Sequence, residues 1–376
     1  MKKTLIAIAA LAATGAFAQS TVTIDGYFDR GYVTTNNSNN TKDTKAVGSN
    51  AGTTTIGIKV SEDLGAGLKM GLSVNTDWAD LGGLAQGTVV AQSGAFANSQ
   101  SFAELSDAKM GTLRLGTINN EILTAAVGVA APAFSTGVGS AYSSSWSTFN
   151  GYGTGSTGLG GIVNAPTVGA TNAGVRGIRQ ANTIKYVSPN FSGLTFAYGF
   201  APKNDVSGTG YTVGATDMSI GYANGPLNVT YASIKYEVGS VTPTSATATA
   251  TAAAGANNTH SLLAASYQVM PALKLHAGFG ASKASDTAIA NSTSSQFGVT
   301  YVVGQFNILA QVAKVSDKNT VNYDRSMTGL GVDYNLSKTA RVYARYDNLN
   351  LYSNGTDTAT GGSLIKRMAV GVSKSF

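Results

Sequence analysis

The sequence predicts an all-β protein, a transmembrane antiparallel β-barrel of about sixteen strands. Three observations predict this fold. Short segments along the whole chain alternate apolar and polar residues. The connections between these segments alternate between short turns and long polar loops. No run of about eighteen apolar residues occurs that could form a transmembrane helix.

Residues 1–18 have the composition of a secretory signal peptide. Lys2 and Lys3 give a basic start, residues 5–13 are apolar, and Ala16-Phe17-Ala18 is a small-residue cleavage pattern. A buried N-terminal helix is the alternative. We expect cleavage after Ala18, export from the cytoplasm, and a single barrel domain over residues 19–376.

The composition excludes several kinds of chemistry. The 376 residues include no cysteine and two histidines, so a disulfide framework, a thiolate zinc site and a cysteine nucleophile are absent. Only 12% of residues are charged, about half the usual share for a soluble protein. Without Lys2 and Lys3, 23 basic residues face 19 acidic ones, too slight a surplus for nucleic-acid binding. We predict no enzyme, no cofactor and no metal site.

The alternating segments place apolar side chains on one face and polar ones on the other. A soluble β-sandwich also alternates. Three details favour contact with lipid: polar faces rich in Gly, Ser, Thr, Asn and Gln, segment lengths of about 9–12 residues, and aromatic residues near segment ends. The clearest segments are residues 22–28, 68–75, 194–200, 273–279 and 342–347. The aromatic residues expected to form interfacial girdles are Tyr27, Phe28, Tyr32, Tyr186, Phe200, Tyr222, Tyr236, Tyr267, Tyr301, Tyr334 and Tyr346.

The connections sort by length. Short turns are predicted at 62–67, 106–111, 188–193, 223–226, 269–272, 303–305 and 336–339. Longer polar stretches lie between them, at 34–52, 79–98, 118–179, 202–213, 238–258, 283–292, 316–324 and 352–362. About seven turns and eight loops require an even number of strands, with both termini on the short-turn side. A sandwich has no reason to separate its loops by length in this way.

At this point the chain resembles a known family, the trimeric general porins of Gram-negative bacteria, in the branch typical of betaproteobacteria and neisseriae. The segments that carry the resemblance are residues 22–29, 57–65, 110–116, 186–194 and 333–338, together with the terminal Phe376. Their order and spacing cover essentially the whole mature chain.

The resemblance implies an outer-membrane channel for passive diffusion, surrounded by outer-membrane lipid and lipopolysaccharide and assembled as a homotrimer. It also implies that the third long loop, residues 118–179, folds into the barrel and narrows the pore. About sixty structureless residues are in any case too many for an ordinary connection. The resemblance further implies that Phe376 is read by the outer-membrane assembly machinery.

Strand parity predicts which charges face the lumen. With Ile56 and Ile58 outward, Lys59 points inward. The same reasoning, together with the position of the long loop, gives the predicted pore-lining set: Lys59, Lys69, Asp77, Glu104, Arg114, Glu121, Arg176, Arg179, Lys185, Arg341 and Arg345, with Lys274 also inward. Arg30 has the opposite parity, which fits a membrane boundary or a subunit contact.

These charges predict a preference for anions. No Asp or Glu lies between Glu121 and Asp205, so Glu121 is the one acid available within the long loop to compensate basic residues of the wall. Thr55 and Thr117 stand where related porins often carry arginine, so the cationic wall is expected to be thinner or rebuilt from Arg176 and Arg179. Small anions and hydrophilic solutes are the expected cargo.

Other functions remain open at this point. A solute-specific channel would carry a stacked aromatic track in the lumen, whereas parity sends most aromatics outward. A hydrolase with its site at the barrel rim is the main rival class. Asp333 and Asp347 flank a turn region and are not spaced as a convincing acid–base pair. A translocator would need a passenger domain, but the first strand begins about three residues after the expected cleavage site.

Overall fold

A computed structural model describes most of the expected barrel. It covers residues 20–37, 44–77, 96–131, 134, 136–140, 179–203, 206–207, 213–238, 241–242, 257–284, 291–317, 325–351 and 363–376. The predicted signal peptide, the cleavage site at Ala18 and Arg176 lie outside these described residues.

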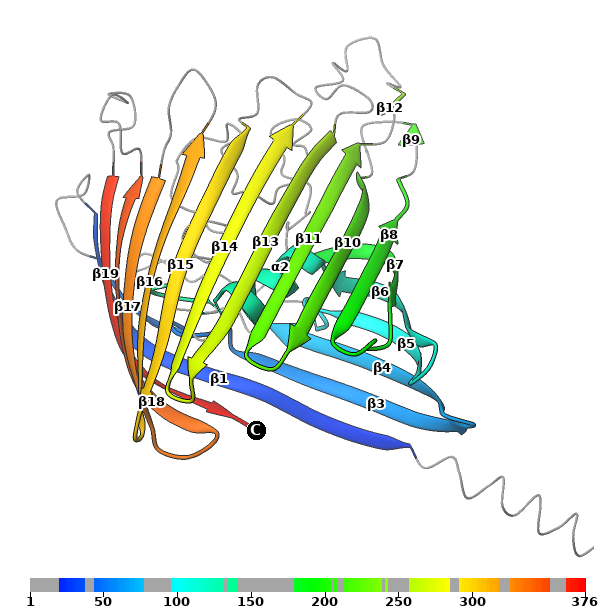
Figure 1. The fold of residues 1–376 in the computed structure, drawn as a ribbon, viewed down its shortest axis with the longest axis horizontal. Helices are drawn as coiled ribbons and strands as arrows, with labels where there is room; N and C mark the ends of the chain where they lie inside the picture. Colours follow the sequence, from blue (N-terminus) through cyan, green and yellow to red (C-terminus); the bar gives the residue numbers. More distant parts are fainter. Residues whose placement is uncertain are drawn as a thin grey trace, which may run out of the picture.

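The described chain forms a closed antiparallel sheet with sixteen positions around the barrel (Figure 1). The second position is shared by two short strands, β2 and β3, which both pair with β1. The first eight strands of the sheet are β1 (Thr21–Asn37), β2 (Thr44–Gly48), β3 (Thr55–Gly65), β4 (Leu68–Asp77), β5 (Ser101–Asp107), β6 (Gly111–Asn119), β7 (Arg179–Val187) and β8 (Leu194–Ala201). The remainder are β10 (Val213–Asn224), β11 (Leu227–Val238), β13 (Asn257–Met270), β14 (Leu273–Ala284), β15 (Ser292–Val303), β16 (Phe306–Asp317), β17 (Arg325–Asn335), β18 (Ala340–Leu351) and β19 (Ser363–Ser375).

The first and last strands close the sheet. β1 pairs with β19 from Tyr27 opposite Ser375 to Asn37 opposite Ile365. The backbones of Gly26 and Phe376 exchange two hydrogen bonds of 3.1 Å just beyond this register. A closed sheet leaves no unpaired edge, which is the condition for crossing hydrocarbon with strands. The predicted all-β barrel fold is confirmed.

Alternation separates two faces along the strands. In β14, Leu275 and Phe279 are exposed on the outside, whereas His276 and Gly278 lie on the inner face. Apolar side chains facing outward on every side suit a lipid environment. Two aromatic residues expected in the girdles are corrected by the structure: Tyr27 hydrogen-bonds to Arg341 inside the barrel, and Tyr236 is fully buried on the inner face.

The short turns gather at one end of the barrel together with the carboxyl terminus (Figure 1). Gly225 and Gly304 occupy two of these turns with φ of 54° and 57°, a conformation that glycine adopts without steric cost. Glycine thus fits these two turns between alternating segments, whereas the turns at 271–272 and 336–339 form without it.

The long connections contain more structure than predicted. Within 34–52, β1 continues to Asn37 and β2 follows. Within 202–213 and 238–258, β9 (Val206–Ser207) and β12 (Val241–Thr242) pair in parallel. The stretch 118–179 begins with the end of β6, then a helix, α2 (Glu121–Ala125), and a π-helical turn, η1 (Ala126–Ala130). The expectation that this stretch is structureless was therefore wrong.

α2 and η1 lie inside the barrel and form one apolar cluster with the inner face of the wall (Figure 1). Ile122, Ala126 and Val129 pack against inward side chains of β11 and β13, among them Ile234 and Leu262. β11 and β13 carry apolar residues on both faces at the level of these helices. The helices therefore cover inner-face side chains that would otherwise contact water. Neither helix in the described part of the chain is long and apolar enough to cross a membrane.

Candidate functional site

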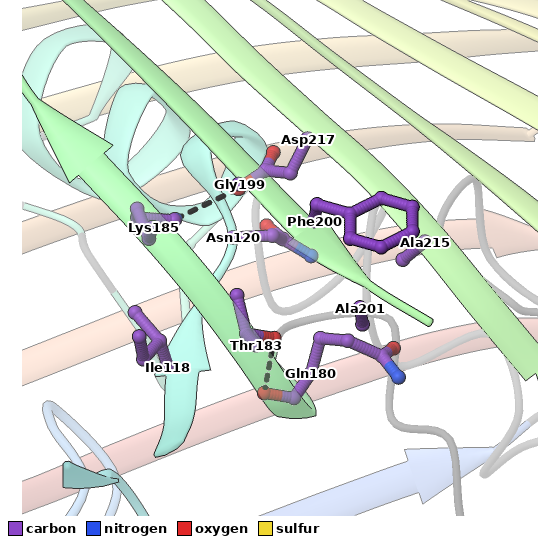
Figure 2. A pocket seen from close by; sticks show the side chains of 10 residues that line it. All are labelled: Ile118, Asn120, Gln180, Thr183, Lys185, Gly199, Phe200, Ala201, Ala215 and Asp217. Atoms are coloured by element: carbon purple, nitrogen blue, oxygen red, sulfur yellow. Dashed lines mark hydrogen bonds and ion pairs between the residues drawn. The ribbon is translucent and has the colours of Figure 1, made fainter. Parts of the chain in front are cut away.

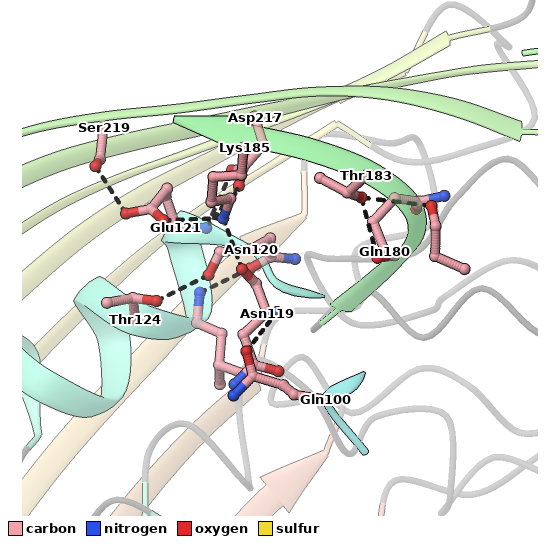
Figure 3. A network of polar contacts seen from close by, with 12 residues as sticks. Gln100, Asn119, Asn120, Glu121, Thr124, Gln180, Thr183, Lys185, Asp217 and Ser219 are labelled. Atoms are coloured by element: carbon pink, nitrogen blue, oxygen red, sulfur yellow. Dashed lines mark hydrogen bonds and ion pairs between the residues drawn. The ribbon is translucent and has the colours of Figure 1, made fainter. Parts of the chain in front are cut away.

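A buried lysine ties the start of the long loop to the barrel wall. The side chain of Lys185 in β7 is 2% exposed, and its Nζ lies 2.9 Å from Glu121 Oε1 and 2.7 Å from Asp217 Oδ2. Nζ also donates to the carbonyl oxygen of Asn119 at 2.7 Å (Figure 3). A buried ammonium group is tolerated only when its donors are satisfied by charged or polar acceptors. Each of the three N–H donors of the Lys185 ammonium group has such an acceptor.

The two carboxylates of this group also fix the amino terminus of α2. Both oxygens of Asp217 accept from the backbone N–H of Glu121 at 3.0 Å. Asn120 caps the helix because its Oδ1 accepts from the N–H of Leu123 at 2.8 Å. Ser219 donates to Glu121 Oε2 at 2.8 Å. We call Lys185, Glu121 and Asp217 the lysine lock.

A small cavity adjoins the lysine lock between β6, β7, β8 and β10 (Figure 2). Asn120, Thr183 and Gln180 contribute polar groups to it, whereas Ile118 and Ala215 contribute apolar ones. The cavity belongs to the packing around the lysine lock, since Lys185 and Asp217 are among its lining residues.

The loop then follows the inner wall. His276 of β14 donates from Nδ1 to the carbonyl oxygen of Val129 at 3.3 Å. Further along, the backbone N–H of Gly139 donates to Asp347 of β18 at 2.8 Å. The guanidinium of Arg345 stacks on the ring of Phe134, with 5.0 Å from its central carbon to the ring centroid. Residues 121–140, where described, thus run from β10 around to β18.

A second segment bends inward to meet the loop. Between β2 and β3, the backbone N–H groups of Asn50, Ala51 and Gly52 all donate to one oxygen of Asp29, at 2.6–2.9 Å. Consecutive N–H groups that converge in this way form a concave anion-binding site. The carbonyl oxygen of Asn50 accepts from Val138 at 2.8 Å, so this segment supports the loop from the side of β1.

The predicted pore-lining residues divide into two groups. The side chains of the first group are largely buried, and each of its basic residues has an acidic partner. Arg345 pairs with Asp333 at 2.7 Å, and Arg179 pairs with Asp77 at 3.2 Å. The pairs of the buried group are Lys185 with Glu121 and Asp217, Arg345 with Asp333, and Arg179 with Asp77. Arg367, which was not predicted to line the pore, forms a further buried pair with Asp347.

The second group faces water inside the barrel. The side chain of Lys59 is 52% exposed and pairs with Asp25. Arg114 pairs with Glu104 at 2.9 Å and lies over the ring of Phe102. The water-facing bases are Lys59, Lys69, Arg114 and Arg341, and the water-facing acids are Asp25, Asp63 and Glu104. Arg341 also pairs at 2.9 Å with the buried Asp333, which it shares with Arg345.

The expectation that the wall cations are poorly compensated was therefore wrong. Residues 118–179 contain one acid, Glu121, and the other acids that compensate these cations come from the strands. Asp217, Asp333 and Asp347 were missed as site residues, and so was Asp29. Parity could have found them, since Asp217 alternates with the outward Met218 and Asp333 alternates with the outward Val332.

Arg30 lies on the outer side of β1, as its parity predicts. Its Nη1 donates to Thr54 Oγ1 at 3.0 Å and to the carbonyl oxygen of Asp29 at 2.7 Å. Its guanidinium also lies over the ring of Phe28. The side chain thus contacts the place where residues 49–54 leave the wall. A metal site is not formed in the described residues, since no three His, Asp or Glu side chains gather suitably there.

Comparison with known proteins decides the family. The model of the Gram-negative porin family matches residues 4–354. The chain belongs to the Gram-negative porins. It is similar to outer membrane porin protein 32 of Delftia acidovorans, with 29% identity over 378 residues that cover 99% of this chain and 95% of that protein.

Solved porin structures share the fold. An anion-selective porin from Comamonas acidovorans has a TM-score of 0.72 at 22% identity, covering 95% of this chain and 100% of that one. OmpT of Vibrio cholerae in its trimer form has a TM-score of 0.58 at 13% identity, covering 95% and 99%. This porin is therefore an outer-membrane channel and not an enzyme. The alternative function, a hydrolase with its site at the barrel rim, is not favoured.

Proposed function

We propose that this porin lets small hydrophilic solutes diffuse passively across the outer membrane, with a modest preference for anions, through a lumen narrowed by residues 118–179. The observation that carries this proposal is the hydrated inner wall of a closed barrel, where charged side chains of β1, β3, β5 and β6 remain accessible to water. A porin makes no bonds, so its chemistry is an electrostatic filter.

The preference for anions rests on the water-facing charges. Lys59, Lys69, Arg114 and Arg341 outnumber the acids in the same environment by a small margin. The buried pairs carry no surplus of positive charge, because their four bases lie against five carboxylates. A tenfold preference needs about 1.4 kcal/mol, and one unit charge at ~4 Å contributes about 1 kcal/mol in water and up to ~4 kcal/mol near a protein surface. A small surplus of water-facing positive charge is therefore sufficient for a modest preference for anions. The anion-selective relative from Comamonas acidovorans adds support.

Reversal potentials in a planar bilayer test this proposal. With KCl at unequal concentrations on the two sides, a channel that prefers anions gives a reversal potential of the same sign as the chloride equilibrium potential. The double variant Lys59→Gln/Lys69→Gln should move this potential toward the potassium value. A potassium-selective wild-type channel would overturn the anion preference, while any ion-conducting channel would keep the diffusion function.

A solute-specific channel is the second candidate. Phe102 of β5, whose ring contacts Arg114, and Phe134 of the long loop, whose ring contacts Arg345, are aromatic residues inside the barrel, but they contact different strands of the wall. A stacked track needs neighbouring rings, so nonspecific diffusion is favoured. Single-channel conductance with and without sugars, phosphate or carboxylates separates the two, because a specific solute blocks the ion current at low concentration.

We also propose a homotrimer in which the outer face near Arg30 contacts a second subunit. An arginine on the lipid face costs about 2–4 kcal/mol at the bilayer centre, which favours a protein neighbour there. The trimer form of the OmpT relative supports the same assembly. Crosslinking of Arg30→Cys pairs, or the mass of the detergent complex, tests it, and a monomer at working concentration would contradict it.

Phe376 is the proposed signal for the assembly machinery. Its backbone pairs with Gly26, and a Cβ at Gly26 would lie 2.5 Å from its ring, so the residue also seals the barrel seam. Phe376→Ala should reduce the amount of folded porin in cells more than it reduces the yield of refolding in detergent. An equal reduction in both would assign Phe376 a purely structural role. Sequencing the amino terminus of the exported protein tests cleavage after Ala18, with Gln19 expected first.

A further inference from the structure

The second position of the barrel contains an insertion that leaves the wall. β2 ends opposite Gly31 of β1, and β3 begins opposite Tyr27. The six residues 49–54 therefore face only residues 28–30 of β1. Extra residues that bend out of a strand ladder form a β-bulge, and bulges are frequent next to functional sites because they redirect the chain. We call residues 49–54 the inner bulge.

The carboxylate of Asp29 holds the middle of the inner bulge. Its Oδ2 accepts from the backbone N–H groups of Asn50, Ala51 and Gly52. Asp29 is fully buried, and a buried carboxylate is tolerated only where donors surround it. Hydrogen bonds to an ionised acceptor are about twice as strong as those between neutral groups. The three bonds therefore fix the path of the bulge more firmly than a neutral acceptor would.

Tyr343 of β18 reaches the same carboxylate across two strands. Its hydroxyl donates to Asp29 Oδ1 at 2.5 Å. Tyr343 pairs with Gly371 of β19, which pairs in turn with Gly31 of β1. A Cβ at either glycine would lie 2.4 Å from the hydroxyl oxygen of Tyr343, so the ring can cross the inner wall only because both positions are glycine. One oxygen of Asp29 is thus held by the bulge and the other by Tyr343.

The two ends of the inner bulge are fastened to backbone groups of the wall. Asn50 Nδ2 donates to the carbonyl oxygens of Gly31 and Gly48, both at 2.9 Å. The hydroxyl of Thr54 donates to the carbonyl oxygen of Asp29 and accepts from its N–H, both at 3.1 Å. Weakening the carboxylate should therefore free the middle of the bulge without opening the barrel.

The tip of the long loop rests on the inner bulge. The carbonyl oxygen of Asn50 accepts from the N–H of Val138 at 2.8 Å. Gly137 lies so close that a Cβ there would be 2.2 Å from the same oxygen, and its φ of 87° also favours glycine. The side chain of Val138 is buried at this contact. The position of the loop tip therefore depends on the position of the bulge.

We propose that Asp29 and Tyr343 are positioning residues of the pore, which act through the inner bulge to hold the tip of the long loop in the lumen. The contacts run from the Tyr343 hydroxyl to Asp29 and from Asp29 to the bulge. They end at Val138 of the loop. This inference rests on the proposed narrowing of the lumen by residues 118–179, and it names strand residues that decide where the narrowing segment lies.

A single cysteine at the loop tip tests the proposal, because the chain has no cysteine of its own. Val138→Cys replaces a buried side chain of the tip, so its thiol should react slowly with a water-soluble methanethiosulfonate reagent. Adding Tyr343→Phe keeps the ring but removes one hydrogen bond to the buried carboxylate. Loss of such a bond raises the population of the displaced tip about tenfold or more, and the labelling rate should rise by the same factor.

Asp29→Asn in the Val138→Cys background removes the charge that all of these donors share. We expect it to raise the labelling rate at least as much as Tyr343→Phe, with a parallel rise in open-channel current noise in a planar bilayer. Tyr27→Phe is the matched control. It also removes an inward hydroxyl and keeps the ring, but that hydroxyl accepts from Arg341. Its labelling rate should equal that of Val138→Cys alone.

Two results would overturn the proposal. One is an unchanged labelling rate in Tyr343→Phe and Asp29→Asn, measured on protein that keeps the heat-modifiable mobility of a folded barrel. The other is an equal rise in Tyr27→Phe, which would mean a general loosening of the inner wall. Tyr343→Phe alone decides the matter if Asp29→Asn does not fold. Conductance and reversal potential of the wild-type channel test the proposed diffusion separately, so failure of the labelling test leaves that function standing.

Discussion

Gly329 of β17 and Gly139 of the long loop touch backbone to backbone. A Cβ placed on Gly329 would lie 2.1 Å from the carbonyl oxygen of Gly139, a distance that real contacts do not reach. At the same place the N–H of Gly139 donates to Asp347. The loop thus reaches the wall only because this wall position has no side chain.

Gly329→Ala should therefore displace the loop. The strand is held by neighbours on both sides, so residues 137–140 must move toward the pore axis. We expect lower single-channel conductance and a stability loss of about 1–3 kcal/mol, the usual cost of overpacking. Planar bilayer recording and thermal unfolding in detergent measure the two effects.

Gly298→Ala is the matched control. It lies on the inner face of the neighbouring wall, but a Cβ there would have its nearest contacts at 3.5–3.7 Å, which is ordinary packing. This variant should keep wild-type conductance. Equal behaviour of the two alanine variants would contradict the idea that the wall contact positions the loop.

Lys185→Met should destabilise the porin strongly. The substitution keeps the length of the side chain but leaves Glu121 and Asp217 as two adjacent buried carboxylates. Breaking a buried pair in this way costs about 3–5 kcal/mol. Urea unfolding in detergent, followed by the loss of heat-modifiable mobility, measures the change.

Lys59→Met provides the comparison, because its partner Asp25 is also well exposed. Exposed pairs contribute about 0–1 kcal/mol. A loss of stability in Lys59→Met as large as that in Lys185→Met would show that burial of the lock does not matter.

Arg114 and Arg345 should differ in their effect on ion selectivity. The side chain of Arg114 is 34% exposed in the lumen, whereas that of Arg345 is 1% exposed and lies beneath Phe134. Arg114→Gln should shift the reversal potential toward the potassium value, since ions pass close to it in water. Arg345→Gln should mainly lower stability. A larger selectivity shift in Arg345→Gln would reverse the assignment.

The fold was predictable because each strand of the barrel corresponds to a local pattern of apolar and polar residues in the sequence. Alternation in segments such as 273–279 gives the strands and their outward faces, and the sorting of connection lengths gives an even strand number. Parity even placed Arg30 on the outside and Lys59 on the inside. Tyr27 and Tyr236 lie near strand ends, which predicts a place in the girdles, but their parity directs both side chains inward.

The candidate site was less predictable because strand parity indicates which way a side chain points but not whether that side chain is buried. Lys185 and Lys59 both point inward, yet one is buried beneath a helix and the other stays in water. The difference depends on where the long loop lies, and that depends on contacts such as Glu121 with Asp217, 96 positions apart in the chain. No local pattern encodes a contact of this kind.

Asp347→Asn should loosen the far attachment of the loop. Asp347 accepts from the N–H of Gly139 and forms an ion pair with Arg367, and it is fully buried. Asparagine keeps the shape but removes the charge, so Arg367 loses its partner. Hydrogen bonds to charged groups contribute about 1.5–3 kcal/mol, enough to raise the population of a detached loop by roughly 10–150-fold. We expect larger current fluctuations in the open channel, measured at fixed voltage. Asp25→Asn, which removes an exposed carboxylate of β1, two strands away from β18, should leave the fluctuations unchanged while shifting selectivity toward chloride. Matching noise in the two variants would mean that Asp347 does not hold the loop.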